Sequence, residues 1–488
     1  MKNVFTKSND YKQEYSCSIV QIEEVKPIEG SDFLGQSLVN GFPIVVRKDQ
    51  VKSGDILFYA PIECELDSTF CKVNNLYEDN ELNEDHDKKG YFNKYGRVRI
   101  IKLRGLPSMG YLFGLNEVNN LLKANGHSTI TEEDMVVGTD FDTIAGDLFV
   151  KAFIPRISSD AIVGCGNKDK LNNRLKRFDC MIPGEFSPHY STTQFEREFR
   201  TFNPDDDVTV SVKLHGTSII IGNIKIREPR LGGLYAKYFE YIPKILRFIK
   251  EKYDYVYSSK KVILNKDINP DFEYSFNDSA KYTKYYELFS KNNLLPKGVT
   301  IYGEIVGYNE NGNPIQKIGG AKDNVKQNKK TDNAYDYGCN VGENKLMIYR
   351  INEALPDGTH YEWDVPSVLE WTKKLIREHP DMAQHIHPID ILYTGKLGDL
   401  YPDLDQSNHW HENLLERMKN DKIWYMEENE PLCTNKVPRE GVVIRKNGDV
   451  LKEAFKLKTM KFRFGEEKSV SAGNIDVEML ECYGGEEN

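Results

Sequence analysis

A lysine between two β-rich segments is the first residue of this chain that could do chemistry. Lys213 ends an alternating apolar run that begins at Val208, and a short turn leads from it into the β-rich residues 218–221. This pattern predicts a strand, a tight turn and a second strand. Gly216, inside the turn, allows close approach of a bulky ligand. A lysine that points into a cleft between sheets can act as a nucleophile on phosphorus or on a carbonyl carbon. A surface lysine at a hairpin is the alternative.

Two acidic residues follow in strand-like segments. Glu304 lies inside the apolar run 299–307, where a carboxylate is costly unless it meets a hydroxyl group or a cation. Glu440 directly precedes the apolar run 441–444, and a carboxylate at the mouth of a strand can hold a divalent ion or its waters.

Two further lysines and one ring complete a candidate nucleotide site. Lys456 and Lys458 are two residues apart in a strand-like segment, so they share one face and repel each other unless an anion such as a triphosphate lies opposite. Tyr349, in the predicted strand 346–351, offers a ring that can cover a base, although a core position is the alternative. A free lysine has a pKa near ~10.4 and is almost always protonated. We therefore expect Lys456, Lys458 and a metal ion to favour the neutral amine of Lys213 and to neutralise the transferring phosphoryl group.

Composition places the chain among ordinary globular proteins. It has 488 residues, of which 39% are hydrophobic and 29% charged, which is enough for two or three domains. Its net charge of −10 argues against a protein that coats nucleic acid non-specifically, but a local basic groove remains possible. No signal-like or membrane-spanning apolar run is present, so we expect a cytoplasmic protein without a membrane partner. The eight cysteines are scattered and form no C-x-x-C pair, which favours reduced thiols over zinc.

The residue patterns also predict the domain organisation. About five short alternating segments within residues 15–115 predict an OB-type β-barrel that binds nucleic acid. We expect an N-terminal domain at 1–154, a linker at 155–180 and a second domain at 181–488, with insertions near 231–295 and 353–435. Helices are predicted at Glu117–Ala124, Ala236–Tyr253, Val365–Glu378 and Trp410–Asn420. Arg97 and Arg99 lie in a barrel segment that could follow a phosphate backbone, or form a solvated outer face.

The order of these motifs resembles the covalent nucleotidyltransferase superfamily of ATP-dependent ligases and mRNA capping enzymes, over about residues 186–464. The form Lys213-x-His215-Gly216-Thr217 is closer to RNA ligases than to the K-x-D-G of DNA ligases and capping enzymes. The N-terminal segments, Leu103-Arg104-Gly105 among them, are similar to the OB domain of the RNA ligase 5 type. The resemblance implies an α+β fold in which the OB-type barrel precedes an adenylyltransferase (ATP-grasp-like ligase) domain of antiparallel sheets flanked by helices.

The resemblance also implies a role for each motif residue. Lys213 would take AMP, with Leu214, His215 and Gly216 beside it in the ATP site. Glu304 would bind the ribose, Tyr349 would stack on adenine and Glu440 would bind a metal ion. Lys456 and Lys458 would contact the α-phosphate. Arg227, preferred to Arg230, would be the downstream arginine of the ATP site. Arg104 would join Arg97 and Arg99 in nucleic-acid binding, and Arg197 or Arg200 would touch phosphate.

The function expected from this resemblance is that of an ATP-dependent RNA ligase that uses Mg²⁺ or Mn²⁺. Its substrate would be RNA, or an RNA-containing duplex, with 5′-phosphate and 3′-hydroxyl ends, most readily at a nick, and the protein would act as a monomer. A GTP-dependent capping-type guanylyltransferase and an inactive nucleic-acid-binding relative are the alternatives.

Overall fold

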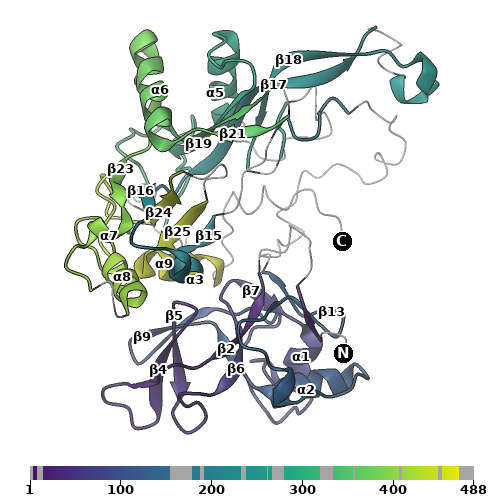
Figure 1. Cartoon of the computed structure of the whole chain (residues 1–488), viewed down its shortest axis with the longest axis vertical. Coiled ribbons are helices and arrows are strands. Elements are labelled where there is room, and N and C mark those ends of the chain that lie inside the picture. The colour runs from purple at the N-terminus through teal and green to yellow at the C-terminus, as the bar shows by residue number, and fades with distance from the viewer. Residues whose placement is uncertain are drawn as a thin grey trace. The chain divides into compact units, whose positions relative to one another are not determined.

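The computed structural model of the chain describes residues 4–7, 15–153, 179–186, 192–231, 238–260, 262–265, 280–318, 333–355, 358–405, 409–448 and 453–471. The chain divides into two compact units, Met1–Pro155 and Arg156–Asn488 (Figure 1). The predicted linker at 155–180 falls almost wholly outside the described residues. Within the described ranges, no helix combines the length and the apolar character needed to cross a membrane.

Short antiparallel strands build the first unit. Its strands are β1 (Phe5–Thr6), β2 (Cys17–Gln21), β3 (Lys26–Pro27), β4 (Leu34–Val39), β5 (Phe42–Arg47), β6 (Ile56–Ala60), β7 (Cys64–Leu66), β8 (Ile100–Leu103), β9 (Leu106–Met109), β10 (Tyr111–Phe113), β11 (Asp140–Phe141), β12 (Thr143–Ile144), β13 (Asp147–Leu148) and β14 (Val150–Ala152). Its helices are α1 (Ser68–Val73) and α2 (Leu115–Ala124). The largest sheet has the order β10-β6-β2-β11, and β3-β4-β5 form a second sheet. The five predicted strand segments and the helix near 117–124 are therefore confirmed.

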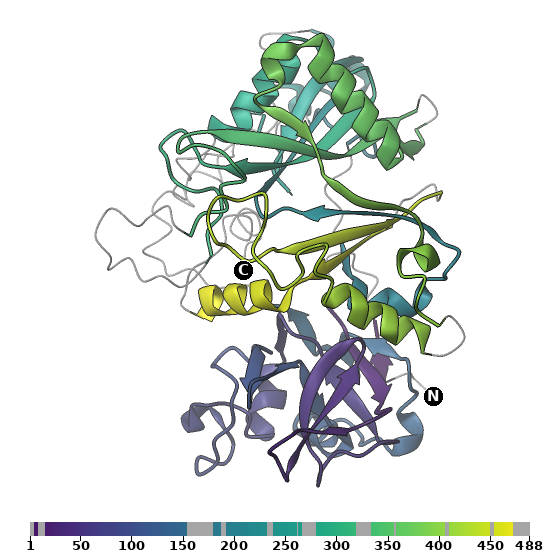
Figure 2. The same ribbon diagram turned by 90° about the vertical axis from the view of Figure 1, so that its left-hand side faces the viewer.

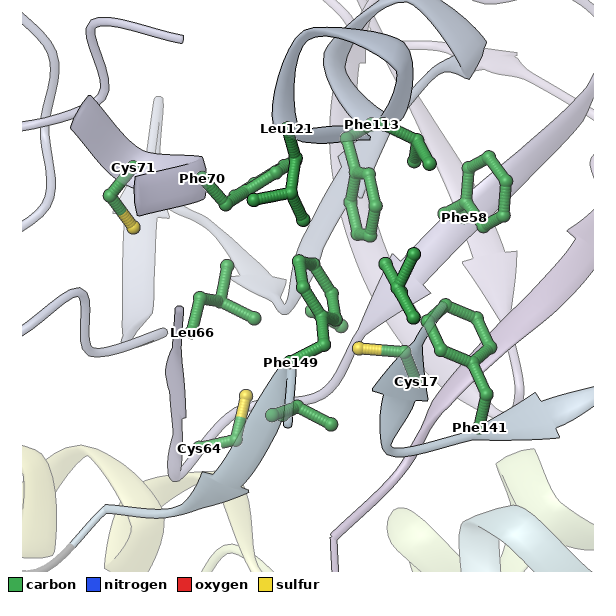
Figure 3. Packing of buried hydrophobic residues seen from close by; sticks show 14 of the residues in the cluster. Cys17, Phe58, Cys64, Leu66, Phe70, Cys71, Phe113, Leu121, Phe141 and Phe149 are labelled. Atoms are coloured by element: carbon green, nitrogen blue, oxygen red, sulfur yellow. The ribbon is translucent and has the colours of Figure 1, made fainter. Parts of the chain in front are cut away.

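Phenylalanine rings fill the core of this unit. Phe58, Phe113 and Phe141 come from three different strands, Phe70 from α1 and Phe149 from the link between β13 and β14, and each is at most 2% exposed. Figure 3 shows the rings close together: Phe70 and Phe149 meet edge-on with centroids 5.0 Å apart, and Phe58 and Phe113 are stacked at 5.3 Å. Such aromatic contacts add to the apolar burial that holds the short strands together.

Two sheets organise the second unit. Its strands are β15 (Thr193–Gln194), β16 (Asp207–Lys213), β17 (Thr217–Pro229), β18 (Ile249–Ser258), β19 (Val299–Gly307), β20 (Asn344–Ala354), β21 (His360–Glu362), β22 (Ile386–Pro388), β23 (Ile391–Lys396), β24 (Gly441–Lys446) and β25 (Ala454–Lys458). Its α-helices are α3 (Phe195–Glu198), α5 (Ala280–Lys291), α6 (Val365–Glu378), α7 (Leu397–Leu400), α8 (Trp410–Lys419) and α9 (Met460–Ser471). One sheet has the order β18-β17-β19-β20-β21 with β22 beside β20, and the other has the order β15-β25-β24-β16-β23. Figure 2 shows the two sheets as separate layers.

Helices pack against one face of each sheet, and the opposite face carries most of the motif residues. In the six-stranded sheet, alternate residues such as Ile219, Ile301 and Ile348 pack with α5 and α6 in one buried cluster. Figure 1 shows both helices beside this sheet. In the five-stranded sheet, Val208, Ile444 and other apolar residues pack with α3 and α8. Because side chains alternate along a strand, the intervening residues of both sheets point to the opposite faces. Among them are Lys213, Glu304, Lys456 and Lys458.

One predicted helix is wrong. Residues 249–253 of the predicted helix Ala236–Tyr253 belong to β18, and the described part of the preceding segment forms only the short 3₁₀ turns η6 (Phe239–Tyr241) and η7 (Lys244–Leu246). β18 pairs with β17 from Ile249 opposite Pro229 to Ser258 opposite Ile220. Ten ladder pairs along an available strand edge outweigh local helix propensity, which is a weak preference.

The two segments predicted as insertions supply parts of this framework. Residues 231–295 contribute β18 and α5, and residues 353–435 contribute β21, α6, β22, β23, α7 and α8. The helices predicted at 365–378 and 410–420 are confirmed as α6 and α8.

Candidate active site

The turn after Lys213 joins the two sheets. β16 belongs to the five-stranded sheet and β17 to the six-stranded sheet, so these strands form no hairpin. Residues that follow β19 hold this turn in place. The backbone N–H of His215 donates to Tyr337 Oη at 2.7 Å, and Gln316 Nε2 donates to the Gly216 carbonyl at 2.9 Å. A Cβ on Gly216 would lie 2.4 Å from the Ile305 carbonyl oxygen. The glycine is thus required by the close approach of two backbones.

Lys213 and Lys458 meet across the five-stranded sheet. Lys213 stands opposite Gly441, and Gly441 stands opposite Lys458, so the two lysines flank the glycine in one row. Between them lies the carboxylate of Glu440, whose Oε1 is 2.6 Å from Lys213 Nζ and 3.9 Å from Lys458 Nζ. Gly441 has a φ of +150°, and a Cβ there would come within 2.0 Å of the Leu457 carbonyl oxygen. No residue with a side chain fits this position without moving β25.

Glu440 is a buried acid that stays ionised. Its residue is only 3% exposed, and His215 Nδ1 lies 3.8 Å from its Oε2. Burial raises the pKa of Glu440, but the positive charges of Lys213, His215 and Lys458 together outweigh burial and bring that pKa below its ordinary value. Among the described residues, Glu440 Oε2 is buried and has no hydrogen-bond partner. A buried carboxylate oxygen with a spare acceptor site is chemically suited to a hard divalent cation such as Mg²⁺ or Mn²⁺.

Glu304 is tied to the turn of the lysine. It stands opposite Ser218 on β17, and its Oε2 accepts from the Ser218 hydroxyl at 3.2 Å. Its Oε1 accepts from the backbone N–H of Gly216 at 3.0 Å. Ser218 therefore supplies the hydroxyl partner that this acid needs inside the apolar run. The same contacts place a carboxylate on the strand next to the turn that follows Lys213.

Tyr349 occupies a break in strand pairing. Tyr302 pairs with Arg350 but Gly303 pairs with Ile348, so Tyr349 is the extra residue of a β-bulge. Its half-buried ring belongs to a cluster with Val212 and Leu214, the residues on either side of Lys213. The Arg445 guanidinium lies 5.9 Å from the ring centroid.

Lys456 lies in the same sheet as the other two lysines. It is half-buried and stands opposite Val443 of β24 and beside Gln194 of β15. Lys458 is two residues further along β25, so the two side chains share a face of the strand, as the sequence predicts.

The structure does not bring Arg227 to this cluster. Arg227 lies nine residues beyond Ser218 on β17, which corresponds to about 30 Å along a strand. Its Nη2 donates to the carbonyls of Asp179 and Met181 at 3.3 and 2.8 Å. Its position and contacts are those of a residue that fixes the chain ahead of α3, so the expectation that it binds ATP is corrected.

The arginines predicted to contact nucleic acid differ in how far their side chains are exposed. Arg97 is 5% exposed and packs inside the first unit, so it is not part of a surface that could follow a phosphate backbone, and this expectation is corrected. Arg99 is half-buried and donates to the Tyr91 carbonyl, and Arg104 is exposed and donates to the Gly30 carbonyl. In the second unit, Arg197 is half-buried, and Arg200 is exposed and forms an ion pair of 2.9 Å with Glu412.

Two further acids at or near the site carry no motif signal. Glu466 of α9 contacts Lys458 Nζ with both carboxylate oxygens, at 2.8 and 2.9 Å. Glu362 of β21 accepts from Arg350 at 2.6 Å and from Arg445 at 3.1 Å, and so links the two sheets behind Tyr349. Glu466 follows Lys458 by eight residues in a charged helix, and only the fold of that helix back over the strand brings the two together.

Comparison with known proteins bears on this arrangement. A sequence-family profile described as an OB-fold domain matches residues 16–115. A solved structure of a Naegleria gruberi RNA ligase variant with ATP and manganese aligns over 94% of this chain and 99% of its own, with a TM-score of 0.50 and 15% identity. The chain has the fold of this RNA ligase. A second variant of the same RNA ligase, also with ATP and manganese, aligns over 93% of this chain and 99% of its own, again with a TM-score of 0.50 and 15% identity. No curated protein matches the sequence significantly.

The predicted α+β fold is therefore confirmed, with an OB-fold domain at the N-terminus and antiparallel sheets flanked by helices after it. The roles expected of the individual site residues are taken up as proposals below.

Proposed function

We propose that this protein is an ATP-dependent RNA ligase of the RNA ligase 5 type. The observation that carries the proposal is the row formed by Lys213, Glu440 and Lys458, in which a nucleophile candidate is 2.6 Å from a buried carboxylate and is flanked by a second cation. Glu304, Tyr349 and Lys456 stand around the same turn and strands. The shared fold with an RNA ligase supports this assignment.

In the first step, the neutral amine of Lys213 attacks the α-phosphorus of ATP. A nitrogen–phosphorus bond forms, the bond to the β-phosphate oxygen breaks, pyrophosphate leaves, and the proton of the amine is lost to solvent. Lys456 and Lys458 would contact the α-phosphate and stabilise the charge that develops on it. Glu304 would bind the ribose and Tyr349 would stack on adenine, with Leu214, His215 and Gly216 lining the nucleotide.

Two further transfers complete the joining of the ends. AMP passes from Lys213 to a 5′-phosphate, and the 3′-hydroxyl of the other end then attacks that phosphate and releases AMP. Each step depends mainly on positioning and charge neutralisation. Glu440 would hold Mg²⁺ or Mn²⁺, whose charge would offset that of the phosphates. Nicked duplexes with RNA at the 3′-hydroxyl end are the proposed substrate, and a monomer is the proposed active form.

Transfer of label from nucleotide to protein tests the first step. We expect the protein, incubated with α-labelled ATP and Mn²⁺ or Mg²⁺, to acquire label, and Lys213→Ala to abolish labelling. Lys225→Ala is the matched control because Lys225, on the next strand, lies outside the site and pairs with Glu185 at 3.8 Å. Labelling by GTP in preference to ATP would favour a capping-type enzyme. Absence of labelling with either nucleotide and both metals would contradict the proposal.

The substrate is tested with one 5′-phosphate end presented in three settings. We expect sealing on a duplex whose 3′-hydroxyl strand is RNA, weaker sealing on an all-DNA duplex, and the least without a template. Equal sealing without a template would contradict the assignment of nicked duplexes.

A further inference from the structure

Lys458 has a second acidic partner that no motif includes. Both carboxylate oxygens of Glu466 contact Lys458 Nζ, at 2.8 and 2.9 Å, whereas Glu440 Oε1 is 3.9 Å away. The Lys458 side chain is 12% exposed and that of Glu466 is 32% exposed. The stronger contact of Lys458 is therefore with the more accessible of the two acids.

A well-anchored helix holds Glu466 in this place. At the start of α9, Glu427 Oε2 accepts from the backbone N–H of Lys461 at 3.0 Å, and Thr459 Oγ1 accepts from that of Phe462 at 3.2 Å. In the same turn of the helix, Arg463 Nη2 donates to the buried Glu196 at 2.9 Å. Glu466 follows on the same helix, so its carboxylate approaches Lys458 from a fixed direction.

Glu466 adds a second carboxylate to the cations of the row. Lys213 and Lys458 bring two ammonium groups to Glu440, which supplies one negative charge, and Glu466 supplies the second. Two like charges beside one buried carboxylate repel each other. A polyphosphate would supply negative charge to the same ammonium group, and the proposed function requires it to contact Lys458. Glu466 and the nucleotide therefore compete for the same ammonium group.

We propose that Glu466 is the counter-ion of Lys458 in the nucleotide-free protein and that the phosphates of ATP displace it. The inference rests on the proposed function, because it assigns Lys458 to the nucleotide phosphate. Glu466 acts through Lys458 and does not touch the reacting atoms. Its removal frees a cation for ATP, so the variant binds ATP more tightly, which is the opposite of what a purely structural role would produce.

The experiment compares Glu466→Gln with Glu467→Gln in the intact protein. Both changes remove one negative charge from adjacent positions of α9, but Glu467 accepts from Ser471 on the helix itself. The initial rate of lysyl-AMP formation is measured over a range of ATP concentrations at fixed Mn²⁺. We expect Glu466→Gln to lower KM for ATP roughly twofold to fivefold, the size of a partly exposed ion pair, with kcat unchanged within about twofold. Glu467→Gln should leave both constants unchanged.

A double-mutant cycle shows whether the effect passes through Lys458. In the Lys458→Gln background, Glu466→Gln should no longer change KM for ATP. An unchanged or higher KM in the single variant, or the same decrease in both backgrounds, would overturn the role of Glu466. The proposed function is judged separately, because a wild-type protein that forms no lysyl-AMP contradicts the function, whereas a labelled wild type with an unaffected Glu466→Gln variant contradicts only this inference.

Discussion

At the scale of single residues, the site depends on two glycines as much as on its charged groups. Gly216 lets the turn of the lysine pass so close to β19 that a Cβ would lie 2.4 Å from a carbonyl oxygen, and Gly441 separates the two lysines of the row. Both glycines sit beside a residue that carries the proposed chemistry, His215 in one case and Glu440 in the other. The backbone conformation at Gly216 and Gly441 therefore determines where the neighbouring His215 and Glu440 side chains lie.

Gly441→Ala tests this requirement. The substitution places a Cβ within 2.0 Å of the Leu457 carbonyl oxygen at a φ of +150°, so β24 and β25 must separate. We expect a loss of about 2–4 kcal/mol in the free energy of unfolding, from overpacking and backbone strain together, as measured by urea denaturation. Gly448→Ala is the matched control, because Gly448 has a φ of +98° but a Cβ there would meet no atom of the described residues within 4 Å. Equal losses for the two variants would show that the contact with Leu457 is not the cause.

At the scale of elements, a bulge in β20 determines where the ring of Tyr349 lies. The pairing shift beside Gly303 leaves Tyr349 without an opposite residue on β19, while Ile348 still packs towards the helices. The ring thus joins Val212 and Leu214 on the face towards the other sheet. The sequence pattern of β20 is that of one continuous strand, but its register shifts at Tyr349, the residue proposed to stack on adenine.

Substitution of this tyrosine separates its ring from its hydroxyl group. If the ring stacks on adenine, Tyr349→Ala should raise KM for ATP in lysyl-AMP formation by roughly fivefold to a hundredfold, since stacking on a base contributes about 1–3 kcal/mol. Tyr349→Phe retains the ring and should change KM by less than about threefold. The measurement is the ATP dependence of the labelling rate. A Tyr349→Ala variant with wild-type KM and intact folding would assign the ring to the core alone.

At the scale of the second unit as a whole, an ion-paired group joins its two sheets. Glu362, of the six-stranded sheet, lies between Arg350 of the same sheet and Arg445 of the other, and its side chain is 2% exposed. Burial lowers the pKa of Arg445, and the charge of Glu362 raises it. The group fixes the distance between the sheet that carries Lys213 and the sheet that carries Glu304, and it lies behind the ring of Tyr349.

Removal of the acid from this group should cost more than its replacement as a unit. Glu362→Ala leaves two guanidinium groups buried without their shared carboxylate, and we expect a loss of about 3–5 kcal/mol in the free energy of unfolding. The triple variant Glu362→Leu, Arg350→Met and Arg445→Met removes all three charges and should recover most of that loss. Urea denaturation of both variants gives the comparison. A triple variant as unstable as Glu362→Ala would show that packing, and not unpaired charge, is responsible.

The sequence by itself determined the strands and the motif residues they carry. Alternating or continuous apolar runs predicted β16, β19, β24 and β25 nearly to the residue, because such a run is a local property of a few neighbours. The spacing of short alternating segments predicted the OB-fold domain. The helix prediction at 236–253 is wrong because it also used only local pattern. Pairing with the edge of β17, which lies outside that local pattern, places residues 249–253 in a sheet.

Tertiary structure alone decided which charged groups meet. It placed Lys213 and Lys458 on either side of one carboxylate, brought Glu466 back over Lys458, put Arg97 inside the first unit and carried Arg227 away from the site. Strand pairing, the fold of α9 and burial are long-range outcomes of packing two sheets against their helices. The order of residues along the chain does not contain them, because contacts between side chains depend on distances that only the folded backbone fixes.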